Sequence, residues 1–191
     1  MGHPLKKPTG KYTWQDYLTW PDEERWEVID GVAYTMTPSP TEYHQRIAGN
    51  FYVALRERLK NYHCRAYMAP LDVYYDDLNF VQPDVFIVCD RSKVRDRIYG
   101  APDLIIEIIS PSTSLKDKRE KKKLYEKFGV KEYIIIHPEE LIVERYYLTG
   151  EKYPEAEVFG PYETLPLCLF EGTEIPLWEV FDLDLPESRE Q

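Results

Sequence analysis

The segment Asp103-Leu-Ile-Ile-Glu-Ile-Ile-Ser-Pro-Ser-Thr113 carries one acidic residue inside an otherwise apolar run. Residues 104–109 are apolar on both faces of an extended strand except at Glu107. Such a run is typical of a central strand that is covered on both sides. A carboxylate is costly to bury there unless it meets a cation, a metal ion or a strong hydrogen-bond donor. The rest of the chain must therefore supply a partner for Glu107.

The segments around this strand predict an α/β fold with a mixed sheet. Apolar residues recur at helical spacing from Thr41 to about Tyr62, and this spacing predicts a helix. Three strands with short connections follow, which favours an antiparallel meander: 65–76 (one or two strands around Pro70), 85–89 and 103–109. A capping-box-like Ser114-Leu-Lys-Asp117 predicts the next helix, which ends near Gly129.

The buried-looking strand at 131–137 completes the predicted core, because a strand, a helix and a strand in sequence imply a right-handed crossover and parallel pairing. The core order is therefore helix, three strands, helix, strand. Before it, we expect a short helix capped by Thr13 and a hairpin around Asp30-Gly31. After it, residues 141–148 and 152–159 predict a β-rich extension. We expect a single domain over residues 1–191, with its core at about 12–181.

Composition and charge restrict the function classes. The net charge of −10 argues against tight nonspecific binding to nucleic acid. Residues 91–131, however, hold 12 Lys/Arg against 6 Asp/Glu, so a local surface for an anion remains open. No apolar run approaches the length of a membrane span, and residues 1–11 lack a signal-peptide core, which predicts a cytoplasmic protein without a membrane partner.

The three cysteines are Cys64, Cys89 and Cys168. They lie far apart in the sequence and do not have the spacing of a zinc site. An odd number of cysteines in a protein expected in the cytoplasm favours free structural thiols. We therefore expect no disulfide.

Asp84 is the first candidate to lie beside Glu107. It opens the predicted strand 85–89, whereas Glu107 lies near the end of the neighbouring antiparallel strand, so one edge of the sheet can hold both carboxylates. Two close carboxylates repel each other, and a divalent cation relieves this repulsion. Hard oxygen ligands favour Mg²⁺ or Mn²⁺, and the carbonyl of Ile108 can supply a third oxygen. The competing interpretation of Asp84 is a turn cap after Pro83.

Lys121 is the second candidate. Leu124, Tyr125 and Phe128 define the buried stripe of the helix that follows Glu107, and Lys121 lies one helical turn before that stripe. Among the lysines at 116–123, it is the one expected to point toward the sheet and Glu107. The alternative is a solvated charged face, which suits the rest of this run.

Two carboxylates, a metal ion and a lysine are suited to hydrolysis of a phosphodiester. The metal ion polarises the phosphate and acidifies a bound water, and the lysine neutralises developing charge or orients that water. The basic residues around the central strand are candidates to hold backbone phosphates: Arg91, Lys93 and Lys118.

The combined motif resembles the Uma-two family, a restriction-endonuclease group in the PD-(D/E)XK nuclease superfamily. The residues that carry the resemblance lie over about 12–181: Trp26 to Gly31, His44, Pro83-Asp84, Glu107 to Thr113, Asp117, Lys121, Tyr125, Gly129-Val130 and Glu132-Tyr133. The resemblance implies a restriction-endonuclease-like fold, Asp84 and Glu107 as metal ligands, and Lys121 as the catalytic lysine moved onto the helix. Position 109 is Ile, where the superfamily motif has Lys.

Two further residues match family positions. The resemblance implies that Glu27 adds a carboxylate to the metal site and that His44 positions water or phosphate. The plain alternatives are the polar face of a hairpin for Glu27 and a core histidine for His44.

Three functions remain open on the sequence. The first is a Mg²⁺-dependent endonuclease acting on DNA, with a homodimer as the form that would cut two strands. The second is a binding or assembly module with the nuclease fold but no turnover, in which Lys121 pairs directly with Glu107. The third is a metal-dependent hydrolase of a small phosphorylated molecule in a closed pocket.

Overall fold

The computed structural model describes residues 10–21, 24–36, 40–110 and 117–185. Its main sheet has six strands in the order β11-β10-β9-β8-β6-β3. Their bounds, in chain order, are β3 (Arg65–Met68), β6 (Val85–Val88), β8 (Leu104–Ile108), β9 (Glu132–His137), β10 (Ile142–Tyr147) and β11 (Glu157–Phe159). β3, β6 and β8 pair antiparallel, whereas β8 and β9 pair parallel, so the predicted meander and crossover are both confirmed.

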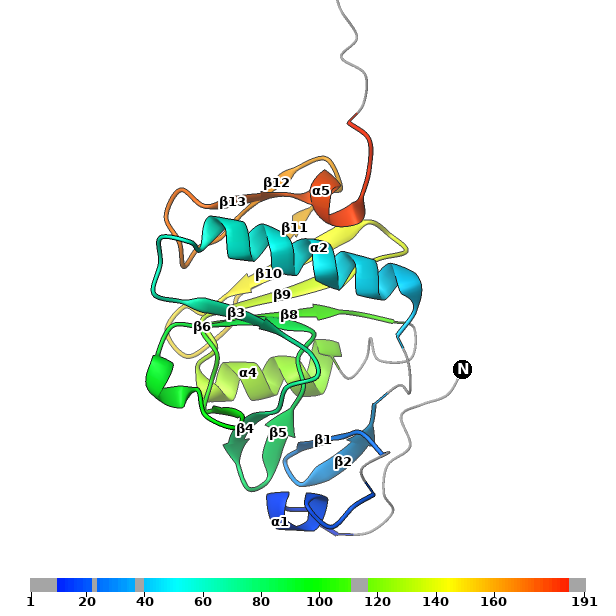
Figure 1. Cartoon of the computed structure of the whole chain (residues 1–191), viewed down its shortest axis with the longest axis vertical. Helices are drawn as coiled ribbons and strands as arrows, with labels where there is room; N and C mark the ends of the chain where they lie inside the picture. The colour runs from blue at the N-terminus through cyan, green and yellow to red at the C-terminus, as the bar shows by residue number, and fades with distance from the viewer. Residues whose placement is uncertain (1–9, 22–23, 37–39, 111–116, 186–191) are drawn as a thin grey trace, which may run out of the picture.

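Helices cover both faces of this sheet (Figure 1). Helix α2 (Glu42–Arg58) lies on one face, and Thr41 caps its first turn by accepting from the N–H of His44. The other face is covered by a π-helical turn, η2 (Asp117–Lys121), and the helix that continues it, α4 (Lys122–Phe128), which ends at a left-handed Gly129. The predicted cap at Ser114 lies outside the described residues.

The alternation of β8 separates the two cores. Leu104, Ile106 and Ile108 pack with α2, whereas Ile105 packs with α4. Because side chains alternate along a strand, Glu107 falls on the same face as Ile105 and is directed to the α4 side of the sheet. The apolar run around Glu107 is thus a doubly covered central strand, as its sequence predicts.

A second sheet packs below α4 in Figure 1, and the sequence did not predict it. Its five strands have the order β2-β1-β5-β4-β7. They are β1 (Trp26–Ile29), β2 (Val32–Thr35), β4 (Val73–Asp76), β5 (Asn79–Val81) and β7 (Ile98–Tyr99). Segment 65–76 therefore divides at the cis Ala69–Pro70 bond into two strands that belong to different sheets. The predicted hairpin at Asp30-Gly31 is confirmed as β1 and β2.

Shorter elements close the fold. The N-terminal helix α1 (Trp14–Tyr17) has the predicted capping box between Thr13 and Asp16. A short 3₁₀ turn, η1 (Arg91–Lys93), follows β6. The C-terminal extension adds the hairpin of β12 (Thr164–Pro166) and β13 (Glu174–Pro176), and α5 (Leu177–Phe181), which packs on α2. No helix among the described residues is long and apolar enough to cross a membrane.

The expectation of free thiols at Cys64 and Cys89 is wrong. These residues form a disulfide, whereas Cys168 is free and exposed. Antiparallel pairing of Arg65 with Val88 places the residue before β3 opposite the residue after β6. Sequence spacing does not reveal this contact, because it depends on the register of two strands and the cysteines are 25 residues apart in the chain.

Candidate active site

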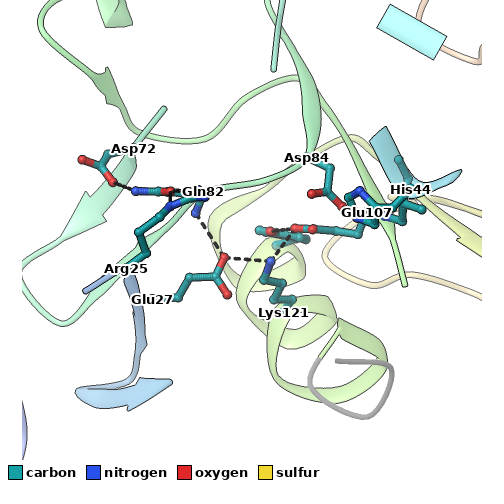
Figure 2. A network of polar contacts seen from close by, with 10 residues as sticks. Arg25, Glu27, His44, Asp72, Gln82, Asp84, Glu107 and Lys121 are labelled. Atoms are coloured by element: carbon teal, nitrogen blue, oxygen red, sulfur yellow. Dashed lines mark hydrogen bonds and ion pairs between the residues drawn. The ribbon is translucent and has the colours of Figure 1, made fainter. Parts of the chain in front are cut away.

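Strand register places Asp84 beside Glu107. Val85 pairs with Ile106, so the next antiparallel position sets Asp84 opposite Glu107 at one edge of the main sheet. Asp84 Oδ2 accepts a hydrogen bond from the main-chain N–H of Ile108 at 2.8 Å. This bond holds the Asp84 carboxylate against the end of β8. Figure 2 shows Asp84, Glu107 and His44 close together on one side of Lys121.

Lys121 lies between two buried glutamates. Its Nζ is 2.8 Å from Glu107 Oε1 and 2.8 Å from Glu27 Oε1. Lys121 and Glu107 are each 3% exposed and Glu27 is 0% exposed. One ammonium group thus faces two buried carboxylates, and the nearby Asp84 adds a third. This predominance of negative charge favours a further cation at the Asp84 edge.

Tyr125 also belongs to this cluster, although the sequence indicated no role for it beyond the buried stripe of the helix. It lies one turn after Lys121 on α4, and its hydroxyl donates to Glu107 Oε1 at 2.6 Å. Burial, followed by the charge of Glu107, raises the pKa of Tyr125 well above its usual range. The phenol therefore remains a hydrogen-bond donor and fixes the orientation of the Glu107 carboxylate. The i, i+4 relation of Lys121 and Tyr125 is the signal that could have identified it.

The second sheet supports Glu27 from below. The main-chain N–H of Gln82 donates to Glu27 Oε1 at 3.1 Å. The Gln82 side chain accepts from Arg25 Nε at 3.2 Å and donates to Asp72 Oδ1 at 2.8 Å. Figure 2 follows this chain of contacts from Asp72 to Glu107. Glu27 is thus a buried group that faces Lys121, and its interpretation as the polar face of a hairpin is wrong.

His44 reaches the same edge from the first turn of α2. Its Nε2 lies 3.3 Å from Asp84 Oδ2, and both side chains are partly buried. The imidazole therefore contacts the sheet edge rather than the apolar stripe of α2. Its place beside Asp84 suits the positioning of water or phosphate.

The structure places Arg91 and Lys93, two of the predicted phosphate-binding residues, away from the acidic pair, and their contact with phosphates stays a prediction. Both residues belong to η1, which follows the far end of β6, whereas Asp84 precedes β6. Lys93 Nζ instead donates to the carbonyl of Ala101 at 2.8 Å. The charge cluster in the sequence is real, but the strand separates these two residues from the site. Lys118 does lie in the turn that carries Lys121.

Lys118 is held by Glu144 of β10. Its Nζ lies 2.7 Å from Glu144 Oε1, and His137 Nε2 lies 3.0 Å from the same oxygen. Tyr146 donates to Glu144 Oε2 at 2.7 Å. The contact with the His137 imidazole, together with the hydrogen bonds from Lys118 and Tyr146, outweighs burial and lowers the pKa of Glu144 to about 2. Lys118 and His137 border a depression of about 300 Å³ that adjoins Ile109 and Ser110, just beyond Glu107.

The lowered pKa of Glu144 predicts an acid-dependent loss of stability. Its folded-state pKa lies below the ordinary 4.5, so its contribution is present above about pH 4.5 and is lost as the pH falls toward 2. We expect Glu144→Gln to remove this part of the pH dependence, at about 1.4 kcal/mol per unit of pKa shift. Urea unfolding between pH 7 and pH 3 measures it, with exposed Glu155→Gln as the control. Parallel pH profiles for wild type and Glu144→Gln would contradict the prediction.

The sheet order, the two flanking helices and the acidic edge define the class of the protein. It has a restriction-endonuclease-like α/β fold, and a solved structure supports this assignment. A crystal structure from Anabaena variabilis, described as "a putative nuclease belonging to DUF820", matches 89% of this chain and 97% of its own chain, with a TM-score of 0.76 and 23% sequence identity.

The sequence matches the model of a particular family within that class. The Uma2 model, described as "Putative restriction endonuclease", matches residues 14–177. The chain belongs to the Uma2 family, as its motifs predict. It is also 27% identical over 129 residues to an uncharacterized protein of Synechocystis sp.. The aligned segment covers 65% of this chain and 67% of that protein.

Proposed function

We propose that this protein is a Mg²⁺- or Mn²⁺-dependent nuclease that hydrolyses phosphodiester bonds of DNA at the Asp84–Glu107 edge. The observation that carries the proposal is the convergence of Asp84, Glu107 and Lys121 at one end of β6 and β8. Membership in a family described as restriction endonucleases supports the same class of reaction. The proposal includes a cytoplasmic protein that acts as a homodimer, since two DNA strands require two such sites.

The donor set fits a hard divalent cation. The Asp84 and Glu107 carboxylates and the carbonyl of Ile108 are oxygen ligands of the kind that Mg²⁺ prefers. The hydrogen bond from the Ile108 N–H fixes the Asp84 carboxylate, and Tyr125 fixes that of Glu107. When bound, the metal ion supplies Lewis-acid activation of the phosphate and of a water.

The protein's own groups have distinct parts in the proposed hydrolysis. Lys121 Nζ stabilises negative charge that develops on the phosphate. His44 orients the attacking water from the α2 side of the edge. Glu27 holds the Lys121 ammonium in place, and Gln82 holds Glu27. Lys118, beside the depression next to Ser110, is positioned to contact a neighbouring phosphate of the same strand.

Asp84→Asn tests this proposal with little change in shape. The amide oxygen can still accept from Ile108 N–H, so we expect the fold to persist, whereas a charged metal ligand is lost. Calorimetric titration of Mg²⁺ and Mn²⁺ should show one class of site in wild type and much weaker binding in the variant. Nicking of supercoiled plasmid should require both wild-type protein and metal ion. Equal metal binding and equal nicking by the two proteins would contradict the proposal.

One observation favours a second candidate function, a binding module with the nuclease fold and no turnover. Lys121 and Tyr125 already satisfy Glu107 Oε1 at 2.8 Å and 2.6 Å. In this candidate the Lys121–Glu107 pair is structural. Wild-type protein that binds neither Mg²⁺ nor Mn²⁺, with and without a DNA duplex present, would support it over the nuclease.

A further inference from the structure

A second group of metal-ligating side chains lies at the opposite end of β6 from Asp84. It consists of His63, Cys64 and Cys89, whose imidazole and sulfur atoms all lie within 4.8 Å of one another. Asp84 precedes β6 and Cys89 follows it, so the two ends are roughly 16 Å apart along the strand. The group is therefore separate from the acidic edge and takes no part in the function proposed above.

The fold, rather than the sequence, assembles this group. His63 and Cys64 lie between α2 and β3, and Cys89 lies directly after β6. The pairing of β3 with β6 brings the two cysteines together. The N–H of Cys89 donates to Asp103 Oδ2 at 2.8 Å, and Lys131 Nζ lies 3.0 Å from the other carboxylate oxygen. Asp103 thus fixes the backbone that carries one of the two sulfur atoms.

Exposure differs across the group in a way that suits an accessible site. Cys64 is 7% exposed and packs in the α2 core, Cys89 is partly buried, and His63 is exposed. An ion can therefore approach from the His63 side, while Cys64 anchors the site in the core. Two sulfur atoms and one imidazole form a soft to borderline donor set, which selects Zn²⁺ over Mg²⁺.

We propose that reduction of the Cys64–Cys89 disulfide opens a Zn²⁺ site formed by the two thiolates and the His63 imidazole, with water as the fourth ligand. A phosphine reductant and one water molecule convert the disulfide to two thiols and a phosphine oxide. Binding of Zn²⁺ then displaces the two thiol protons into solvent. In a tetrahedral site, sulfur atoms about 2.3 Å from the metal lie about 3.8 Å apart, so the two cysteine side chains must rotate apart when the bond is reduced. The disulfide and the Zn²⁺ complex are thus alternative states of one site.

Co²⁺ is the probe for this site, because thiolate ligation gives it charge-transfer absorption and tetrahedral coordination gives it strong visible bands. We expect wild type, once it is reduced by a phosphine and the phosphine is removed under anaerobic conditions, to bind one Co²⁺ per chain that gives both signals; Co²⁺ at an oxygen site gives no thiolate charge transfer. Zn²⁺ should displace the Co²⁺ and raise Tm. The oxidised protein should give no charge-transfer band, and binding should strengthen as the pH rises, since protons are released.

Matched variants distinguish the three proposed ligands from the remaining thiol, that of Cys168. Cys89→Ser and Cys64→Ser should each abolish the Co²⁺ complex of wild type, and circular dichroism should confirm that the variants are folded. His63→Ala should retain thiolate charge transfer with weaker affinity. Cys168→Ser, which removes the free exposed thiol, should bind Co²⁺ like wild type. Asp84→Asn should also bind it like wild type, which keeps this test independent of the nuclease proposal.

Several results would overturn the proposal. They are a disulfide that resists the phosphine in the folded protein, a reduced wild type without thiolate charge transfer, and an unchanged Co²⁺ complex in Cys89→Ser. Identical Co²⁺ spectra of the oxidised and reduced proteins would do the same, because they would place the ion at groups other than the cysteines.

Discussion

Lys121→Met is expected to destabilise the protein by about 3–5 kcal/mol, because it leaves buried carboxylates without the cation that they face. Glu27 and Glu107 each lie 2.8 Å from Lys121 Nζ, and both are almost completely shielded from water. Methionine fills a similar volume, so the loss is electrostatic rather than a loss of packing. Urea unfolding at pH 7 measures the change in the free energy of unfolding.

Lys123→Met is the matched control for this variant. Lys123 belongs to the same helix and is exposed, so its replacement should change stability by no more than about 0.5 kcal/mol. The double variant Glu27→Gln/Lys121→Met should recover part of the loss, since it removes one of the two stranded charges. Equal stabilities of Lys121→Met and Lys123→Met would show that the buried triad carries no net energy.

The same variant bears on the metal site. If Asp84 and Glu107 bind a divalent cation, Mg²⁺ should stabilise Lys121→Met more than wild type, because the cation then compensates a larger excess of negative charge. It should not restore nicking, since the group that neutralises the phosphate is gone. Mg²⁺ should therefore raise the stability of this variant without raising its activity.

The positions of Glu107, Lys121 and Asp84 in the candidate site could be predicted from local sequence patterns. The alternation of β8 fixes which face Glu107 occupies, and helical periodicity fixes which lysine of the 116–123 run points inward. Both patterns involve residues within one element or its neighbour. The antiparallel turn back from β6 to β8 then suffices to place Asp84 at the same edge.

The remaining parts depend on contacts that local pattern does not encode. Glu27 becomes buried only because β1 pairs with β5, which brings the second sheet under α4. The sequence did not predict β5, so local pattern left Glu27 open between a polar hairpin face and the accessory carboxylate that the family resemblance implies. Arg91 is close to Glu107 in sequence, but the two residues lie at opposite ends of the paired strands β6 and β8, which local pattern does not show. Cys64 and Cys89 meet through register alone.

Glu107→Gln is expected to reduce nicking activity by about 10³-fold, since charge stabilisation by a bound metal ion is worth several kcal/mol. The amide keeps the size of the side chain and an oxygen that can accept from Lys121 and Tyr125, so the fold should persist. Mg²⁺ affinity, measured by calorimetry, should fall together with nicking. Glu126→Gln is the control: this acidic residue of α4 accepts from the N–H of Tyr153 at 2.7 Å, away from Glu107.

The stability of Glu107→Gln decides between the two candidate functions even if nicking is weak. Lys121 Nζ then lies beside a single charged carboxylate, Glu27, and the excess of negative charge in the cluster is reduced. If the site binds a metal ion, Glu107→Gln should be more stable than wild type in the absence of Mg²⁺, and Mg²⁺ should no longer stabilise it. A structural ion pair should instead become less stable, because Glu107 supplies half of the charge around Lys121, and Mg²⁺ should have no effect on either protein. The sign of this change thus reports whether Glu107 is held for a cation from solution or for Lys121 alone.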